Sequence, residues 1–306
     1  MIIRISGRTD IIQHYSDWLI KRFEQGYVFA RNPLFQNKVT RYELTPDKVD
    51  CVVLNSKNYK PILPHISSIL ERFPIYCYYT ITAYGKDIEP GIPSIEESIS
   101  TLIQLFQKVG KERIAWCYDP VFKTEKYSID MHLKTFETIA RQTAPYISRC
   151  LFSFVELNKK IEKAMPELIP LTEHEKELLA EGFGKTATHY GIPMQSCGRK
   201  GKYDDYGIKE SGCLTLDMVG TANDLSFRDL RHRGYKEGCA CIESRDIGAY
   251  QTCSSGCKYC IRNNNPEKIS TNQKLFDVNS PLLIGIIKET DTLQQGQQKS
   301  FLDKKG

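Results

Sequence analysis

The sequence predicts an α/β fold in which strands and helices alternate to form a full or partial barrel of the TIM type, with a cysteine-rich C-terminal region. Three observations support this: short apolar runs recur at the spacing of a βα unit, amphipathic helical segments separate them, and a dinucleotide-binding glycine fingerprint is absent. Hydrophobic residues make up 41% and charged residues 26%, as in ordinary globular proteins. The sequence has no apolar run long enough for a membrane span and no signal peptide at its start, so no membrane partner is expected.

Six runs rich in Ile, Val, Tyr and Phe have the composition of buried parallel strands. They cover residues 1–6, 51–54, 75–82, 113–118, 150–155 and 192–196. Residues 27–44 interrupt the pattern, and two β-rich pieces there predict a small hairpin or a loop insertion. In folds of this kind the chemistry lies beyond the carboxyl ends of the strands. The residues that follow the runs, and are therefore expected on the active face, include Asp10, Asn55, Asp119, Glu156 and Cys197.

Three helices are predicted by capping residues that precede apolar residues at helical spacing. Ser94 begins the first helix, and Glu96 and Glu97 lie in its opening turn. Ser128 begins the second, and Thr172 begins a third helix that stops near Gly191.

The regular pattern ends in the last third of the chain. Residues 198–238 have the composition of a long loop, which metal ligation could order. We expect residues 1–197 to form the barrel-like portion, residues 198–285 to form a metal-binding portion that completes the same domain, and residues 286–306 to form a flexible tail. The net charge of +5 is too small to indicate a nucleic-acid partner. A basic run at residues 228–236 is interpreted as a solvated loop, with a phosphate or nucleic-acid site as the alternative.

The 11 cysteines favour metal ligands or catalytic groups over disulfides, because the chain shows no export signal. Those expected to be buried in apolar runs are Cys51, Cys77, Cys117 and Cys150. Those with the spacing C-x3-C-x2-C are Cys253, Cys257 and Cys260. Gly256 allows this loop to wrap tightly, and Tyr259 precedes its last cysteine. Three thiolates this close together can bind three irons of a [4Fe–4S] cluster and leave the fourth iron open, whereas zinc sites more usually have two C-x2-C-like pairs.

A second set of cysteines lies outside that loop. It consists of Cys197, Cys213, Cys239 and Cys241. Four thiolates suffice for a second iron–sulfur cluster or for one zinc ion. The alternative is that Cys197 and Cys213 are ordinary buried residues and that only Cys239 and Cys241 bind a metal.

The cysteine spacing around Tyr259 resembles the signature of the radical S-adenosylmethionine (radical SAM) enzymes. In those enzymes the open iron chelates the amino and carboxyl groups of S-adenosylmethionine (SAM), and the residue that matches Tyr259 packs near the adenine. The whole chain resembles a bacterial and archaeal family of unknown function whose C-terminal cysteines look like this motif. The resemblance rests on the cysteine loop and on residues 6–10, 27–33, 57–58, 82–90, 118–120, 239–241 and 246–250. The chain departs from the family's pattern at Gly7, Ile261, Arg262 and Cys117, the last of which replaces an arginine.

This resemblance implies a circularly permuted radical SAM barrel. Typical radical SAM enzymes carry the cluster loop after the first barrel strand, whereas here it follows residues 242–250. Under a permutation, residues 242–250 would form the first strand and residues 1–6 the second. Ser6, Arg8 and Asp10 would then lie where the Gly-Gly-Glu turn of those enzymes receives the methionine amino group, close to Cys257.

The resulting expectation is an oxygen-sensitive cytoplasmic enzyme that cleaves SAM to methionine and a 5′-deoxyadenosyl radical. A reductant such as flavodoxin or ferredoxin would supply the electron, and the substrate is unknown. Two alternatives stay open. One is an iron–sulfur or zinc protein with a structural or electron-transfer role, and the other is a zinc-containing nucleic-acid-binding module that uses residues 228–236.

Overall fold

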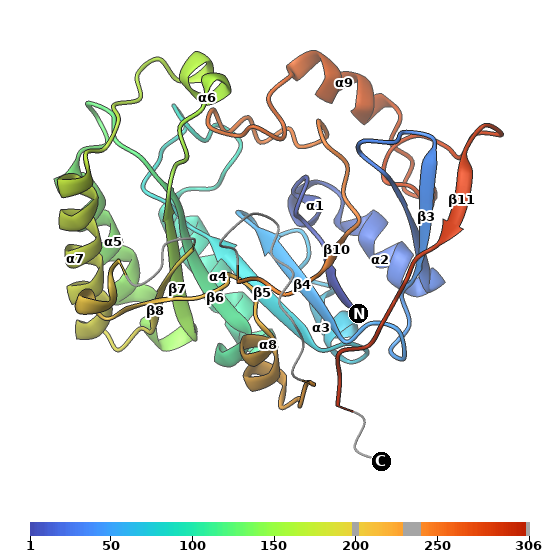
Figure 1. Cartoon of the computed structure of the whole chain (residues 1–306), viewed down its shortest axis with the longest axis horizontal. Helices are drawn as coiled ribbons and strands as arrows, with labels where there is room; N and C mark the ends of the chain where they lie inside the picture. Colours follow the sequence, from blue (N-terminus) through green and yellow to red (C-terminus); the bar gives the residue numbers. More distant parts are fainter. Residues whose placement is uncertain (198–201, 229–239, 304–306) are drawn as a thin grey trace.

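The computed structural model describes residues 1–197, 202–228 and 240–303, and its centre is a sheet of eight strands (Figure 1). In order across the sheet, the strands are β10 (Arg245–Asp246), β1 (Ile2–Arg4), β4 (Cys51–Ser56), β5 (Ile75–Thr80), β6 (Ile114–Val121), β7 (Arg149–Phe154), β8 (Met194–Ser196) and β9 (Ile208–Glu210). Each strand is parallel to its neighbours. The last strand of this sheet along the chain, β10, therefore lies beside the first, β1.

The strand order shows how far the barrel prediction holds. From β1 to β9 the strands of this sheet follow chain order without the reversal that marks a doubly wound sheet. β10 and β9 are the two ends of the sheet, and the described residues form no pairing between them, so a closed barrel is not shown. The α/β class, with a parallel sheet flanked by helices, is confirmed, and closure of the barrel stays a prediction.

Most helices pack on one face of the sheet because successive right-handed crossovers pass on the same side. These helices are α1 (Ile11–His14), α2 (Ser16–Gln25), α3 (Ile66–Leu70), α4 (Ile95–Val109), α5 (Ile129–Thr143) and α7 (Glu173–His189). Alternate side chains of the strands, such as Val52, Leu54 and Trp116, are buried between the sheet and these helices. On the opposite face, Cys51 and Val53 belong to a second core with α8 (Leu216–Asn223), which Figure 1 shows below the sheet.

The three predicted helices begin at the predicted residues. Ser94 accepts a hydrogen bond from the backbone N–H of Glu97, whose side chain accepts one from Ser94 N–H, so α4 begins with a capping box. Thr172 begins α7 in the same way, and Ser128 caps α5. Each cap contributes about 1 kcal/mol to the stability of its helix.

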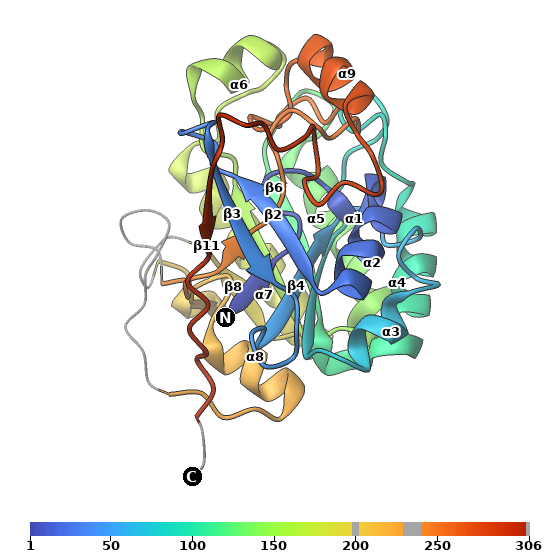
Figure 2. The same ribbon diagram turned by 90° about the vertical axis from the view of Figure 1, so that its right-hand side faces the viewer.

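A three-stranded sheet lies beside the main sheet, as Figure 2 shows. It consists of β2 (Tyr27–Arg31), β3 (Lys38–Glu43) and β11 (Thr292–Gln295). β2 and β3 form the hairpin predicted within residues 27–44. Within residues 286–306, for which a flexible tail is expected, β11 pairs in parallel with β3 and Asp291 forms an ion pair with Arg31 at 2.6 Å. Polar residues join a sheet edge through their backbone groups, which composition does not reveal.

The carboxyl ends of the main strands point toward two further helices, α6 (Lys159–Ala164) and α9 (Pro266–Lys274), at the top of Figure 1. Short 3-10 turns complete the described secondary structure: η1 (Lys111–Arg113), η2 (Ala144–Tyr146) and η3 (Asp204–Tyr206). No helix in the described part of the chain has the length and apolar character needed to cross a membrane.

One buried histidine makes the stability of the fold depend on pH. His132 is 1% exposed; its Nε2 donates to the Phe122 carbonyl (2.8 Å), and its Nδ1 accepts from the Tyr118 hydroxyl (2.9 Å). Burial lowers the pKa of His132 to about 4. Because the unfolded side chain titrates near its ordinary pKa of about 6.5, the unfolded state takes up the proton first as the pH falls. We therefore expect His132 to lower the free energy of unfolding by about 3 kcal/mol as the pH falls from about 6.5 to below 4.

The His132→Gln variant isolates this effect, since glutamine can donate and accept hydrogen bonds but does not titrate. Urea unfolding at pH 7 and at pH 4 measures how much unfolding free energy each protein loses between the two pH values. We expect this loss to be smaller in the variant than in the wild type, by the contribution of His132. The raised pKa values of Asp10, Asp119 and Asp246 act in the opposite direction, but they act equally on both proteins. Equal losses in the two proteins would contradict the prediction.

Candidate functional site

The loop that carries Cys253, Cys257 and Cys260 follows β10 and lies at the carboxyl end of the parallel sheet (Figure 1). Backbone hydrogen bonds join it to the segment after β5: Gly91 N donates to Ser255 O (2.8 Å), and Lys258 N donates to Ile88 O (3.0 Å). A Cβ atom on Gly91 would lie 2.7 Å from the Ser255 backbone, so only glycine fits this approach. Gly256 has a φ of +71°, as expected for a tightly wrapped loop.

The turn at residues 6–10 lies against this cysteine loop. Asn263 connects the two: its Oδ1 accepts from the backbone N–H groups of Thr252 (2.8 Å) and Cys253 (3.0 Å), and its Nδ2 donates to Arg8 O (3.0 Å). Arg262 donates to Gly7 O from the same loop. The turn at residues 6–10 and the cysteine loop are therefore neighbours, as the permutation hypothesis requires.

Ser6 and Arg8, two of the residues predicted to receive SAM, make local contacts. Ser6 Oγ accepts from Ile11 N (3.1 Å), at the start of α1. Arg8 donates to Gly248 O (3.1 Å), and its Nε lies 3.7 Å from Asp246 Oδ1 on β10. Arg8 therefore joins the turn after β1 to the strand that leads into the cysteine loop.

Asp10, the third of these residues, connects the turn to β4. Its Oδ1 accepts from Gln13 N (3.0 Å), which caps α1, and from Ser56 Oγ (2.8 Å). Its Oδ2 accepts from Ser56 Oγ (2.9 Å) and from Lys57 N (3.2 Å). Burial raises the pKa of Asp10 to about 6 despite these bonds. Since both oxygens have protein donors, the geometry favours a positioning role for Asp10.

Glu89, which sequence reasoning did not single out, orients the aromatic residue of the motif. Its carboxylate is 2% exposed, and its Oε1 accepts from Lys57 Nζ (2.9 Å), Thr82 Oγ1 (3.0 Å) and the hydroxyl of Tyr259. Lys57 Nζ also lies 5.8 Å from the centre of the Tyr259 ring. Burial, followed by the nearby Glu89 charge, raises the pKa of Tyr259. In the sequence, Lys57 directly follows a strand, and both residues fall within the ranges 57–58 and 82–90 on which the family resemblance rests.

Three cysteines of the second set converge, although they come from separate segments. Cys213 Sγ lies 3.8 Å from Cys197 Sγ and 3.2 Å from Cys241 Sγ. Sulfur atoms bound to one tetrahedral zinc at about 2.3 Å are about 3.8 Å apart. Hydrogen bonding with the other two thiols, together with burial, raises the pKa of Cys213. As placed, no group of three or more His, Cys, Asp or Glu side chains among residues 1–197, 202–228 and 240–303 could hold a metal ion, and Cys239 lies outside these residues.

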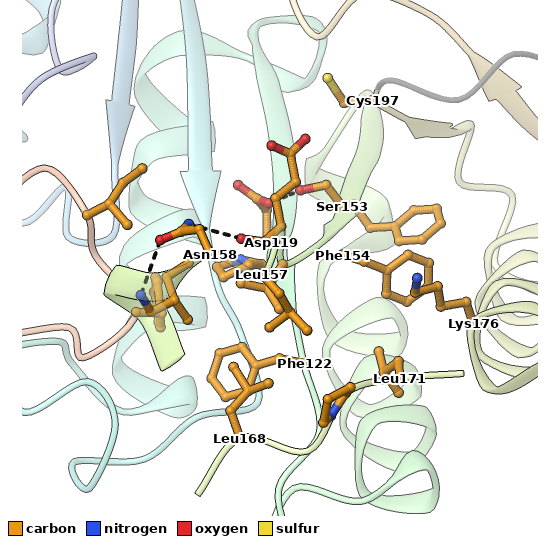
Figure 3. Close-up of a pocket in the computed structure, with 18 of the residues that line it drawn as sticks. Asp119, Phe122, Ser153, Phe154, Leu157, Asn158, Leu168, Leu171, Lys176 and Cys197 are labelled. Carbon is orange, nitrogen blue, oxygen red and sulfur yellow. Dashed lines mark hydrogen bonds between the residues drawn. The ribbon is translucent and has the colours of Figure 1, made fainter. Parts of the chain in front are cut away.

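A cavity of about 620 Å³ lies at the carboxyl ends of β6, β7 and β8. It touches both cysteine sets, because Tyr259, Cys260 and Arg262 line it together with Cys197. Figure 3 shows Asp119 and Ser153 next to one another in the cavity, with Phe122 and Leu168 on one side and Cys197 on the other. The arrangement provides a cavity that reaches both predicted metal-binding regions.

The remaining cysteines have the positions predicted for core residues. Cys51, Cys77 and Cys150 are buried, and Cys117 is half-buried on β6. Burial raises the pKa of all four thiols, to about 12 for Cys77. The basic run at residues 228–236 lies outside the described residues apart from Arg228, so that hypothesis stays a prediction.

Comparison with models of protein families places the chain in a family. The model of a family described as Domain of unknown function (DUF1848) matches residues 2–261, a range that includes the turn at residues 6–10 and the whole cysteine loop through Cys260. No curated protein matches the chain.

Proposed function

Since the chain belongs to the family described as Domain of unknown function (DUF1848), which names no activity, we propose from its own residues that it is a radical SAM-type iron–sulfur enzyme. It would cleave SAM reductively and so start radical chemistry on a substrate that is not identified. One observation carries the proposal: a C-x3-C-x2-C loop lies at the carboxyl end of a singly wound parallel sheet, beside a cavity and beside the turn after β1.

Three thiols in the C-x3-C-x2-C order are the ligand set that a [4Fe–4S] cluster with one open iron needs. The loop carries these thiols on the eight residues Cys253–Cys260. Gly256 gives its backbone a tight turn, and Gly91 lets the segment after β5 approach it closely. When bound, the cluster would supply the electron and the open coordination site that SAM cleavage requires. The position of β10 beside β1 supports a permuted barrel as the scaffold.

The chain's own residues would bind and orient the reactants. The Tyr259 hydroxyl donates to the Glu89 carboxylate, and the Tyr259 ring packs against Phe122 with ring centres 5.7 Å apart, so the ring is oriented before a ligand arrives. Lys57 places a positive charge beside the same ring. The cavity would exclude water from the substrate, which protects a reactive intermediate.

We propose further that Cys197, Cys213 and Cys241 hold a second metal, with Cys239 as the fourth ligand that the sequence predicts. The short distances from Cys213 to the other two thiols support this part of the proposal. The metal would be a second iron–sulfur cluster or zinc. Such oxygen-sensitive centres suit a reducing cytoplasm, with flavodoxin or ferredoxin as the electron donor.

The test is anaerobic reconstitution with iron and sulfide, followed by reduction with dithionite in the presence of SAM. We expect about four irons per chain for one cluster and about eight for two, and we expect 5′-deoxyadenosine and methionine to form. Iron binding without SAM cleavage would overturn the radical mechanism and favour an electron-transfer or structural role. Binding of zinc alone would overturn the iron–sulfur assignment.

A further inference from the structure

The cavity between the two cysteine sets has the size of a small-molecule site. Its volume of about 620 Å³ lies within the range of about 300–1,000 Å³ that is usual for ligand pockets. It begins at Tyr259 and Cys260 of the cysteine loop and continues to Cys197 at the end of β8. A molecule bound in it would therefore lie next to the proposed site of SAM cleavage.

One part of the cavity wall is apolar. It is formed by Phe122, Phe154, Leu157, Leu168 and Leu171. Figure 3 shows Phe122, Leu168 and Leu171 on the same side of the cavity, while Leu157 lies nearer its centre. Phe122 directly follows β6, Phe154 ends β7, and the three leucines come from the segments on either side of α6. They would favour a ligand whose body is apolar or aromatic, because such a body leaves water on binding.

Polar contact at the centre of the cavity comes from Asp119. Ser153 Oγ donates a hydrogen bond to Asp119 Oδ1, which orients the carboxylate, while the residue itself is exposed. A carboxylate can accept several hydrogen bonds, so the bond from Ser153 leaves capacity for a ligand donor. The ligand should therefore carry an O–H or N–H group.

The charges that line the cavity favour a neutral donor group. Asp119 and Glu156 are acidic, and Lys176 and Arg262 are basic, so the charged side chains of the wall balance one another. A ligand with a net charge of either sign would meet side chains of like charge there, whereas a neutral donor group would not.

We propose that this cavity is the substrate site and that it takes an uncharged, largely apolar molecule whose hydroxyl group donates a hydrogen bond to Asp119. Only the role of the bound molecule as a substrate rests on the proposed function, because its binding requires neither iron nor SAM.

Three matched probes test the proposal: 2-phenylethanol, 2-phenylethylamine and phenylacetate share one ring and differ in the charge of the polar end. Their dissociation constants are measured by saturation-transfer NMR on the full chain at pH 7.5, without iron or SAM. We expect 2-phenylethanol to bind at least about tenfold more tightly than either charged probe. Equal or tighter binding of a charged probe would overturn the assigned ligand class.

Two variants locate the binding. Asp119→Leu should weaken 2-phenylethanol binding about tenfold or more, whereas Asp130→Leu on the exposed start of α5 should leave it unchanged. Leu168→Trp should abolish binding by filling the apolar side of the cavity. Unchanged affinity in both cavity variants, with unchanged thermal midpoints, would overturn the proposal. SAM cleavage is measured separately, so this failure and failure of the radical mechanism are distinguishable.

Discussion

The Cys257→Ala variant is expected to lose the cluster of the cysteine loop and to form no 5′-deoxyadenosine above background. Cys257 is the middle thiol of the C-x3-C-x2-C loop, between Cys253 and Cys260, so its removal leaves two ligands where a cluster with one open iron needs three. After anaerobic reconstitution the iron content should fall by about four atoms per chain. Iron analysis and quantification of 5′-deoxyadenosine measure both effects on the same sample.

Cys117→Ala is the matched control for this substitution. Cys117 is half-buried on β6 and belongs to neither proposed ligand set, so its removal should leave the iron content and SAM cleavage unchanged. SAM cleavage that persists in Cys257→Ala at the wild-type rate would eliminate the proposed mechanism. Loss of cleavage in both variants would show that the assay reports general destabilisation instead.

The second large effect is expected for Cys213→Ala. Cys213 Sγ lies 3.8 Å from Cys197 Sγ and 3.2 Å from Cys241 Sγ. Its removal therefore takes away the sulfur that lies next to both of the other proposed ligands. We expect the protein to lose one zinc, or about four irons, while the cysteine loop keeps its own cluster. Because a structural metal stabilises the folded state, the thermal midpoint should also fall.

Metal analysis of wild type, Cys213→Ala and Cys117→Ala checks this expectation. Equal metal contents in the three proteins would contradict a second site. Loss of metal in Cys213→Ala without loss in Cys117→Ala would support the site and, from the metal identified, distinguish zinc from iron.

Much of the local structure was predictable because it depends on neighbouring residues. Ser94 and Thr172 each precede a glutamate by three positions, and this spacing alone specifies a capping box. The buried strands were predictable from their apolar composition, since both faces of β4 and β5 are covered.

The elements that sequence reasoning missed are stabilised by distant partners. α8 has only eight residues, and its Met218 and Val219 pack against β-strands far along the chain. β11 is polar, and its backbone pairs with β3. Glu89 and Tyr259 are 170 residues apart, so nothing local marks the carboxylate as the partner of the ring.

The sequence by itself determined the apolar strands, the helix starts and the spacing of Cys253, Cys257 and Cys260, because each depends on residues a few positions apart. Only the tertiary structure placed β10 beside β1, brought Cys213 to Cys197 and Cys241, and formed the cavity between the two cysteine sets. These contacts join segments that are up to hundreds of residues apart, and their geometry depends on how the whole sheet and its helices pack.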